Sequence, residues 1–194
     1  MKTNIILAGV GGQGILTIAA VLDTAALSCD LNIKQSEVHG MSQRGGAVQS
    51  HVRISDSEIY SDLIPQGKAD IIISVEPMEL LRYLPFLKEG GHLATDSNPF
   101  VNITNYPELE ELYAEIKALP NSILIDAKQV AKDLGNSRAT NIVLLGAVSS
   151  ILPLSDESLM GAIKTLFERK GEKIVNKNIE AFLKGKEIAN EYAS

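Results

Sequence analysis

The sequence NIILAGVGGQGILTIAA, from Asn4 to Ala20, joins a short apolar run to a helical pattern through a cluster of glycines. The run at residues 5–8 predicts a buried strand, and the apolar residues after the glycines recur at the spacing of a helix. Between the two, Gly9, Gly11 and Gly14 form a G-x-G-x-x-G pattern. The stretch therefore predicts a strand, a tight turn and a helix at the very start of the chain.

The glycine turn has the features of an anion-binding loop. Glycine permits positive φ angles and lets a ligand approach the backbone closely. The first N–H groups of the helix that follows, together with the helix dipole, favour a negative charge at the turn. We therefore expect the loop to contact a phosphate or a dinucleotide; the alternative is a tight turn that needs glycine only for packing. The candidate ligand-binding residues of the loop are Gly9, Gly11, Gly12, Gln13 and Gly14.

An acidic residue about 20 positions beyond such a loop can bind the ribose of NAD. Glu37 lies at that distance. An NAD-binding dehydrogenase with Glu37 on the ribose is therefore one alternative function. A partner-binding module without catalysis, in which the glycine turn is structural, is a second alternative.

Composition places the chain among ordinary globular proteins. Its 194 residues, 45% hydrophobic and 22% charged, predict one domain over residues 1–194. A net charge of −6 without a basic run argues against nucleic-acid binding. The first apolar stretch is too short to span a bilayer and lacks the pattern of a signal peptide, which predicts a cytoplasmic protein without a membrane partner.

The single cysteine limits the redox chemistry that the chain can support. Cys29 can form neither an internal disulfide nor a cysteine-ligated iron–sulfur or zinc site by itself. Any redox metal must therefore be held by a partner. Cys29 follows the apolar face of the first helix, and we expect it to be a small buried residue.

Short β-branched runs alternate with helical patterns along the rest of the chain, which predicts an α/β fold. Residues 47–54 alternate with a period of two, and a turn at 55–57 leads into 58–61, which predicts a hairpin and so an antiparallel addition to a mostly parallel sheet. Pro77 begins a helix that Gly90 and Gly91 are expected to end. From residue 141 onward the pattern predicts a helical C-terminal tail. The small residues at 141–152 are expected to allow the close approach of another helix or another subunit, and Ser155 is expected to cap the next helix.

The loops at the carboxyl ends of parallel strands share one edge of a sheet, so residues 9–14 and 37–46 should meet there. Arg44, followed by Gly45 and Gly46, could bind a phosphate or carboxylate with its planar guanidinium, or form an ordinary ion pair. His39 could serve as an acid or a base, because an unperturbed histidine titrates near neutral pH, although a lone loop histidine usually does neither. His51 and His92 lie in predicted strands and are expected to be structural. No nucleophile triad or metal-ligand spacing is present, so no residue is assigned as a catalyst and no metal site is predicted. The side chains expected to line the site are those of Glu37, His39, Ser42 and Gln43.

Two motifs resemble a known family. GVGGQGIL (Gly9 to Leu16) and SEVHGMSQRGGAVQSHVRIS (Ser36 to Ser55) are similar to the gamma-type module of the 2-oxoacid:ferredoxin oxidoreductases. The run EVHGMSQRGG is especially typical of the beta subunits of indolepyruvate:ferredoxin oxidoreductases. The tail segments at residues 141–154 and 172–185 also resemble these subunits, so the likeness spans nearly the whole chain.

The resemblance implies a three-layer α/β/α, Rossmann-like fold and a role as the subunit without clusters. Such enzymes decarboxylate a 2-oxoacid such as indolepyruvate, release an acyl-CoA and pass electrons to ferredoxin. The resemblance places thiamine diphosphate, Mg²⁺ and the 4Fe-4S clusters on a larger alpha subunit, with coenzyme A as co-substrate and no cofactor bound by this chain alone. It also implies that Gly11, Gly12, Gln13 and the segment Arg44 to Gly46 face a cleft shared with that partner.

Overall fold

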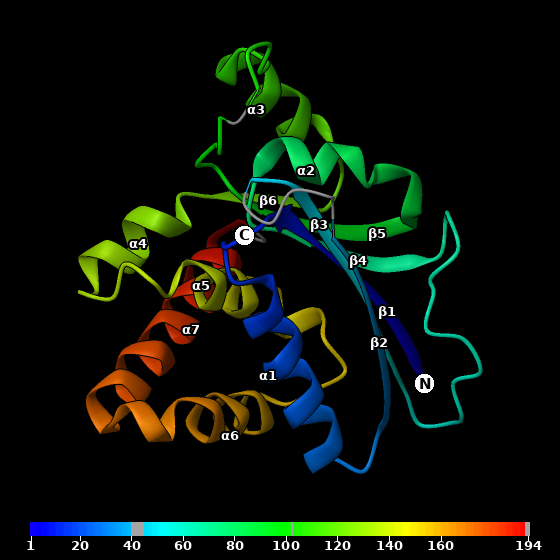
Figure 1. Ribbon diagram of the computed structural model, residues 1–194, viewed down its shortest axis with the longest axis vertical. Coiled ribbons are helices and arrows are strands. Elements are labelled where there is room, and N and C mark those ends of the chain that lie inside the picture. The colour runs from blue at the N-terminus through cyan, green and yellow to red at the C-terminus, as the bar shows by residue number, and fades with distance from the viewer. Residues whose placement is uncertain (40–44, 102, 193–194) are drawn as a thin grey trace.

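A mixed β-sheet runs through the middle of the molecule (Figure 1). The computed structural model describes residues 1–39, 45–101 and 103–192, and over these residues the sheet has six strands in the order β2-β3-β1-β4-β5-β6. β1, β4, β5 and β6 are parallel, whereas β3 is antiparallel to both of its neighbours. The strands are β1 (Lys2–Val10), β2 (Asn32–His39), β3 (Ala47–Ser55), β4 (Ala69–Ser74), β5 (Leu87–Asp96) and β6 (Ser122–Ile125).

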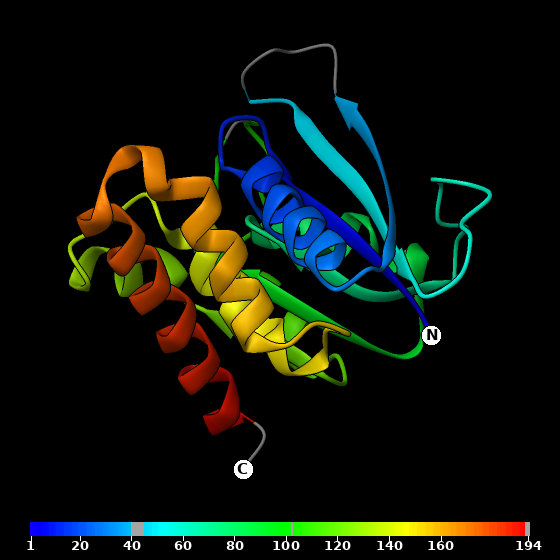
Figure 2. The same cartoon turned by 90° about the horizontal axis from the view of Figure 1, so that it is seen from below.

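Helices cover both faces of the sheet and give the fold three layers (Figure 1). Figure 2 shows the larger layer, in which α1 lies beside α6 and α6 beside α7. The smaller layer contains α2 and α3. This arrangement confirms the α/β/α expectation. The helices are α1 (Ile15–Ser28), α2 (Pro77–Arg82), α3 (Leu109–Ala118), α4 (Ala127–Asp133), α5 (Thr140–Val148), α6 (Asp156–Phe167) and α7 (Glu172–Tyr192), with 3-10 turns at Leu84–Phe86, Ser149–Ile151 and Glu168–Lys170.

The central strand β1 supplies both cores. Ile5 and Leu7 face the layer that contains α1, and Ile6 faces the layer that contains α2 and α3. All three side chains are fully buried. Because successive side chains of a strand point to opposite faces, a continuous apolar run is what a strand covered on both sides requires.

The helical tail packs through glycine. A Cβ atom on Gly146 of α5 would overlap the carbonyl oxygen of Phe182, and one on Gly185 of α7 would overlap that of Val143. The small residues of the 141–152 segment, expected to admit another helix or another subunit, therefore admit α7 of the same chain. No helix in the described parts of the chain is long and apolar enough to cross a bilayer.

The hairpin predicted between residues 47–54 and 58–61 is wrong. β3 instead forms a hairpin with the preceding strand β2, and residues 58–61 form no strand. β3 already has β2 and β1 on its two edges, so no edge is left for a third strand. Side chains of β3 fix the 56–68 loop instead: Arg53 donates to the carbonyl oxygens of Ser61 and Leu63 at 2.6 and 3.0 Å.

The predicted end of the helix after Pro77 is also wrong. Pro77 does begin α2, as expected, but the helix ends at Arg82 and not at Gly90 or Gly91. Pro85 lacks a backbone N–H and cannot continue the helical hydrogen bonds. The two glycines lie inside β5, beside a shift of strand register between Ala69 and Ile71.

Cys29 is exposed, contrary to the expectation that it is buried. It lies just beyond the last residue of α1, where its N–H donates to the carbonyl oxygen of Ala26 at 3.1 Å. The buried stripe of α1 ends at Ala26, so Cys29 falls on the turn and outside the apolar face.

Candidate functional site

The loop between β1 and α1 has two glycines that the fold itself requires. Gly14 precedes α1 in the left-handed conformation, with φ 85° and ψ 25°. A Cβ atom there would lie 2.7 Å from Nδ2 of Asn141, which itself donates to the Gly14 carbonyl oxygen at 2.9 Å. A Cβ atom on Gly9 would overlap the side chain of Val75. Packing alone therefore accounts for these two positions of the motif.

Several polar groups of the loop are already used within the protein. The N–H of Gly11 donates to the carbonyl oxygen of Gly46 at 3.0 Å, and that of Gln13 donates to Val10 at 3.2 Å. The Gln13 side chain folds back, and its Oε1 accepts from the Val10 N–H at 2.8 Å. The turn is thus preformed, and Gly12 is its exposed position.

Three segments meet at this carboxyl edge of the sheet. The Gly11–Gly46 hydrogen bond joins the glycine loop to the residues before β3, which confirms that the two predicted segments meet as far as the described residues extend. The chain after β5 joins them, because Cε1 of Phe100 lies 3.7 Å from where a Cβ atom on Gly45 would be. The edge therefore gathers residues from three separate parts of the sequence.

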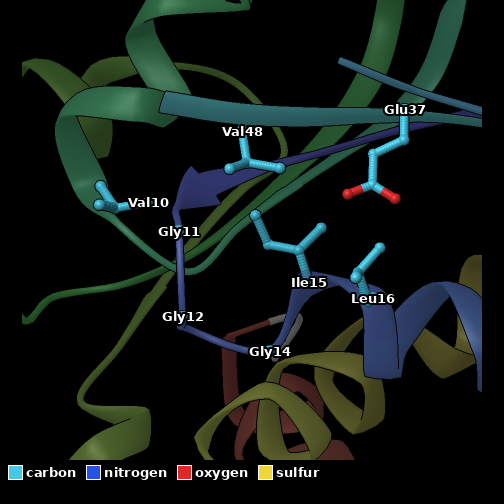
Figure 3. Close-up of a pocket in the computed structure, with 8 residues that line it drawn as sticks. All are labelled: Val10, Gly11, Gly12, Gly14, Ile15, Leu16, Glu37 and Val48. Atoms are coloured by element: carbon cyan, nitrogen blue, oxygen red, sulfur yellow. The ribbon is translucent and has the colours of Figure 1, made fainter. Parts of the chain in front are cut away.

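A cavity of about 290 Å³ lies between this loop, the start of α1 and the β2–β3 hairpin (Figure 3). We call it the glycine cavity. Figure 3 shows the Glu37 carboxylate pointing from β2 toward Leu16. The residues that line it are Val10, Gly11, Gly12, Gly14, Ile15, Leu16, Glu37 and Val48.

The electrostatics of the glycine cavity differ from those of a dinucleotide site. Among the lining residues that the structure describes, Glu37 is the only one with an ionisable side chain, and a carboxylate repels a diphosphate. In the dinucleotide fold the ribose-binding acid follows a strand beside β1, whereas β3 separates β2 from β1 here. The strand order therefore argues against Glu37 as a ribose ligand in an NAD site.

The remaining predicted residues divide into two groups. Ser42, Gln43 and Arg44 lie outside the described residues, so their roles stay predictions. His39 is the last residue of β2 and its backbone is opposite Val48, but its side chain is not described.

The two other histidines lie in strands, as expected. His51 of β3 is buried, and its Nδ1 accepts from the Ile64 N–H at 2.9 Å. His92 lies in β5. The contact of His51 supports the structural role predicted for it.

Glu76 is a buried carboxylate that sequence reasoning missed. It accepts from the N–H groups of Glu79 at 2.8 Å and Phe100 at 3.2 Å, and from the hydroxyl of Tyr106. Burial, reinforced by the Glu76 carboxylate, raises the pKa of Tyr106. These contacts anchor the irregular segment after β5. Its turn-forming composition was visible in the sequence, but the distant acceptor that fixes it was not.

A second cavity, of about 530 Å³, lies on the other side of the glycine loop, toward α4 and α5. Lys128, Arg138 and Lys170 line it, and we call it the cationic cavity. Asp96 is the one acidic residue among its described lining, and its Oδ1 accepts from Asn98 Nδ2 and the Ala127 N–H, both at 3.0 Å. Burial raises the pKa of this carboxyl group. The three cations come from separate segments, so no local motif could have identified them.

The family of the chain is clear from its sequence. Residues 4–188 match the family described as pyruvate ferredoxin/flavodoxin oxidoreductase. The chain therefore belongs to this family, and it is a subunit of an oxidoreductase of the 2-oxoacid:ferredoxin class.

Within this family, the chain is similar to small subunits of indolepyruvate and other oxoacid oxidoreductases. It is 40% identical to the indolepyruvate oxidoreductase subunit IorB of Pyrococcus horikoshii, over 97% of this chain and 96% of the relative. The gamma subunit of a keto/oxoacid ferredoxin oxidoreductase from Geobacter sulfurreducens has a similar structure, with a TM-score of 0.72 and 29% identity over 97% of this chain and 99% of that chain.

The fold also occurs inside a longer enzyme chain. The 2-oxoglutarate:ferredoxin oxidoreductase of Magnetococcus marinus matches with a TM-score of 0.77 and 23% identity, over 98% of this chain and 31% of that chain. That enzyme was solved with 2-oxoglutarate, coenzyme A and succinyl-CoA bound. At this level of identity the likeness concerns the fold.

Proposed function

We propose that the chain, acting as one gamma-type domain over residues 1–194, is the subunit without clusters of a cytoplasmic indolepyruvate:ferredoxin oxidoreductase. The complete enzyme would decarboxylate indolepyruvate or another arylpyruvate oxidatively, form the acyl-CoA and reduce ferredoxin. The similarity to IorB over nearly the full length of both chains supports the choice of substrate.

The main observation in support of a binding site on this chain is the Gly11–Gly46 hydrogen bond at the carboxyl edge of the sheet. It links the glycine loop to the segment that follows Arg44 and leaves the glycine cavity beside both. In the proposal these segments form one wall of a cleft that a larger alpha subunit completes. Exposed apolar side chains at the same edge, among them Leu16, Phe100 and Val101, suit burial against such a partner.

The described residues do not fit the redox groups of such an enzyme. Within residues 1–39, 45–101 and 103–192, no three His, Cys, Asp or Glu side chains come together to hold a metal ion. The sequence has one cysteine, whereas a 4Fe-4S cluster takes four. The proposal therefore assigns thiamine diphosphate, Mg²⁺ and the clusters to the alpha subunit, and ferredoxin reaches this chain only through that partner.

The contribution of this chain would be positioning. A wall that closes the cleft excludes water and orients coenzyme A toward the acyl group on the partner, and orientation alone can account for a large share of a rate enhancement. Gly12, as the exposed position of the loop, and Arg44 are the residues that we assign to coenzyme A.

Reconstitution tests the proposal. The chain is co-expressed with a larger cluster-bearing partner, and reduction of ferredoxin is followed with indolepyruvate, pyruvate or 2-oxoglutarate in the presence of coenzyme A. We expect turnover only when both subunits are present, with indolepyruvate as the best of the three substrates. Turnover by this chain alone, or by the partner alone at the rate of the complex, would contradict the proposal.

A further inference from the structure

The two border strands of the sheet differ in how far they are open to another strand. β6 has four residues, and the carbonyl oxygen of its Leu124 accepts from the Tyr192 hydroxyl. β2 has eight residues, and within the described parts of the chain it pairs only with β3, in one unbroken register. A border strand exposes unpaired N–H and C=O groups, and proteins usually shorten, bend or cover such a strand. β2 contains neither a bulge nor a proline, so its free side can accept a further strand.

One side of α1 borders β2 and carries exposed leucines. Leu16 lines the glycine cavity together with Glu37 of β2, so this side of α1 faces β2 (Figure 3). Asp23 and Leu27 follow about two and three helical turns later, which places them on the same side of the helix. Leu16 is 50% exposed and Leu27 is 64% exposed. We call Leu16, Asp23, Leu27 and the free side of β2 the α1–β2 surface.

Asp23 gives this surface a negative charge without a partner. Its side chain is partly buried, and its Oδ1 has no hydrogen-bond partner among the residues that the structure describes. Burial raises the pKa of this carboxyl group. A lysine or arginine from another chain would supply both the missing hydrogen bond and the opposite charge. The α1–β2 surface therefore suits a strand that carries a cation between apolar side chains.

The same charges disfavour a second copy of this chain as the occupant. Two β2 strands paired about a two-fold axis would present the same surface to each other. Asp23 and Glu37 of both copies would then share one surface, and Lys34, which is exposed on the other face of β2, would approach its own copy. Like charges brought together in this way repel.

The position of the surface favours the larger subunit instead. Leu16 and Glu37 belong to the glycine cavity, which the proposed function places against that subunit. The α1–β2 surface starts at this cavity and continues along α1 and β2 away from it. A partner that covers the cavity is therefore also next to the free side of β2.

We infer that a strand of the larger subunit pairs with the free side of β2 and so extends the sheet across the boundary between the subunits. A lysine or arginine of that strand bonds to Asp23, and its apolar side chains cover Leu16 and Leu27. In this mode of recognition the main-chain hydrogen bonds supply affinity and the side chains supply specificity. The inference rests on the proposed function, because it takes the partner from there and adds where and how that partner is bound.

Hydrogen exchange followed by mass spectrometry, on the full chain alone and in its complex with the larger subunit, tests the inference. We expect residues 32–39 to exchange at least about tenfold more slowly in the complex, because the outward N–H groups of β2 become hydrogen-bonded. Residues 122–125 of β6 are the internal control and should not change. Slow exchange of β2 in the chain alone, together with a dimer in sedimentation, would identify a second copy as the occupant and overturn the inference.

Charge reversal tests the contact of Asp23. Asp23→Lys should raise the Kd of the complex at least roughly tenfold, because it sets two cations against each other. Glu111→Lys makes the same change of charge at an exposed position of α3 and should leave the Kd unchanged. Leu27→Glu, at a more exposed position of the α1–β2 surface, should also weaken the complex, and circular dichroism establishes that each variant is folded.

The outcomes separate this inference from the proposed function. A complex that forms and turns over while β2 exchanges as fast as in the free chain would overturn the inference and leave the proposed function standing. The same holds if Asp23→Lys and Leu27→Glu bind the larger subunit as tightly as the wild type does. Failure of the wild-type chain to form any complex would contradict the proposed function, and the inference with it.

Discussion

Glu76 determines how the chain continues after β5. Its side chain is fully buried and accepts hydrogen bonds from Glu79, Phe100 and Tyr106. The first contact caps α2, and the other two hold the segment that brings Phe100 to the edge of the sheet. One acidic residue thus links the smaller helical layer to the wall of the cationic cavity.

Replacing Glu76 by glutamine should lower the free energy of unfolding by about 2 kcal/mol, because an amide cannot accept all three buried hydrogen bonds. Urea denaturation followed by circular dichroism measures the change. Glu115→Gln, at an exposed position of α3, is the control and should have no measurable effect. Equal stability of the two variants would show that Glu76 is not an anchor.

His51 makes the stability of the 56–68 loop depend on pH. Burial lowers the pKa of its imidazole, and the nearby Arg53 lowers it further, although Asp62 acts in the opposite direction. The neutral ring accepts from the Ile64 N–H, and a protonated ring cannot. Since the unfolded chain takes up this proton at a higher pH than the folded chain does, the contribution of His51 to stability is present above about pH 6.5 and is lost as pH falls through the folded pKa.

We therefore expect the wild-type chain to lose more stability between pH 7.5 and pH 5 than His51→Gln does. Urea denaturation at the two pH values provides the comparison. His92→Gln is the control and should behave like the wild type, because His92 lies in β5 and is not the acceptor that holds the 56–68 loop. A wild type and a His51→Gln variant with the same pH dependence would exclude this coupling.

At the level of elements, the sequence predicted what depends on local pattern. The β1–loop–α1 unit, the helix beginning at Pro77 and the cap of α6 by Ser155 all follow from apolar spacing and capping chemistry, and each is present. The error concerns strand pairing. The alternation of β3 correctly predicted a hairpin strand, but its hairpin partner is the preceding strand β2 and not the residues that follow β3. Alternation indicates which face of a strand is buried and leaves the neighbouring strand undetermined.

The same distinction applies to the site. The meeting of residues 9–14 with 45–46 was predictable, because it follows from where parallel strands end. The cationic cavity was not, because Lys128, Arg138 and Lys170 are separated in sequence and come together only through the packing of α4, α5 and α6. The exposure of Cys29 depends on the point at which α1 ends, and boundaries are the least predictable feature of a helix.

The contact between α5 and α7 should be intolerant of a single methyl group. Gly146→Ala places a Cβ atom against the Phe182 carbonyl oxygen, and the helices must separate to accommodate it. We expect a net loss of about 2 kcal/mol of unfolding free energy, despite the higher helix propensity of alanine. Thermal and urea denaturation measure this loss.

Gly161→Ala is the matched control for that substitution. Gly161 lies within α6, and nothing is within 4 Å of a Cβ atom placed there. The variant should gain up to about 1 kcal/mol from helix propensity. If both variants gained stability, close packing of α5 on α7 would not be the reason for glycine at position 146.

At the scale of the whole molecule, both cavities of the candidate site lie at one edge of the sheet. The glycine loop, the residues before β3 and the segment after β5 all lie at that edge, where they form the glycine cavity and the cationic cavity. Buried polar contacts such as those of Glu76 keep this edge in shape. The molecule thus presents one preformed wall, as the proposed role beside a larger subunit requires.

The most direct test of this account is the Michaelis constant for coenzyme A of the reconstituted enzyme with Arg44→Ala in this chain. The account predicts a complex that still assembles and a KM for coenzyme A raised about tenfold, because one charge-assisted contact to the ligand is lost. Lys117→Ala, at an exposed position of α3 that lines neither cavity, should leave the constant unchanged. An Arg44→Ala enzyme with the same turnover and the same coenzyme A dependence as the wild type would contradict the account.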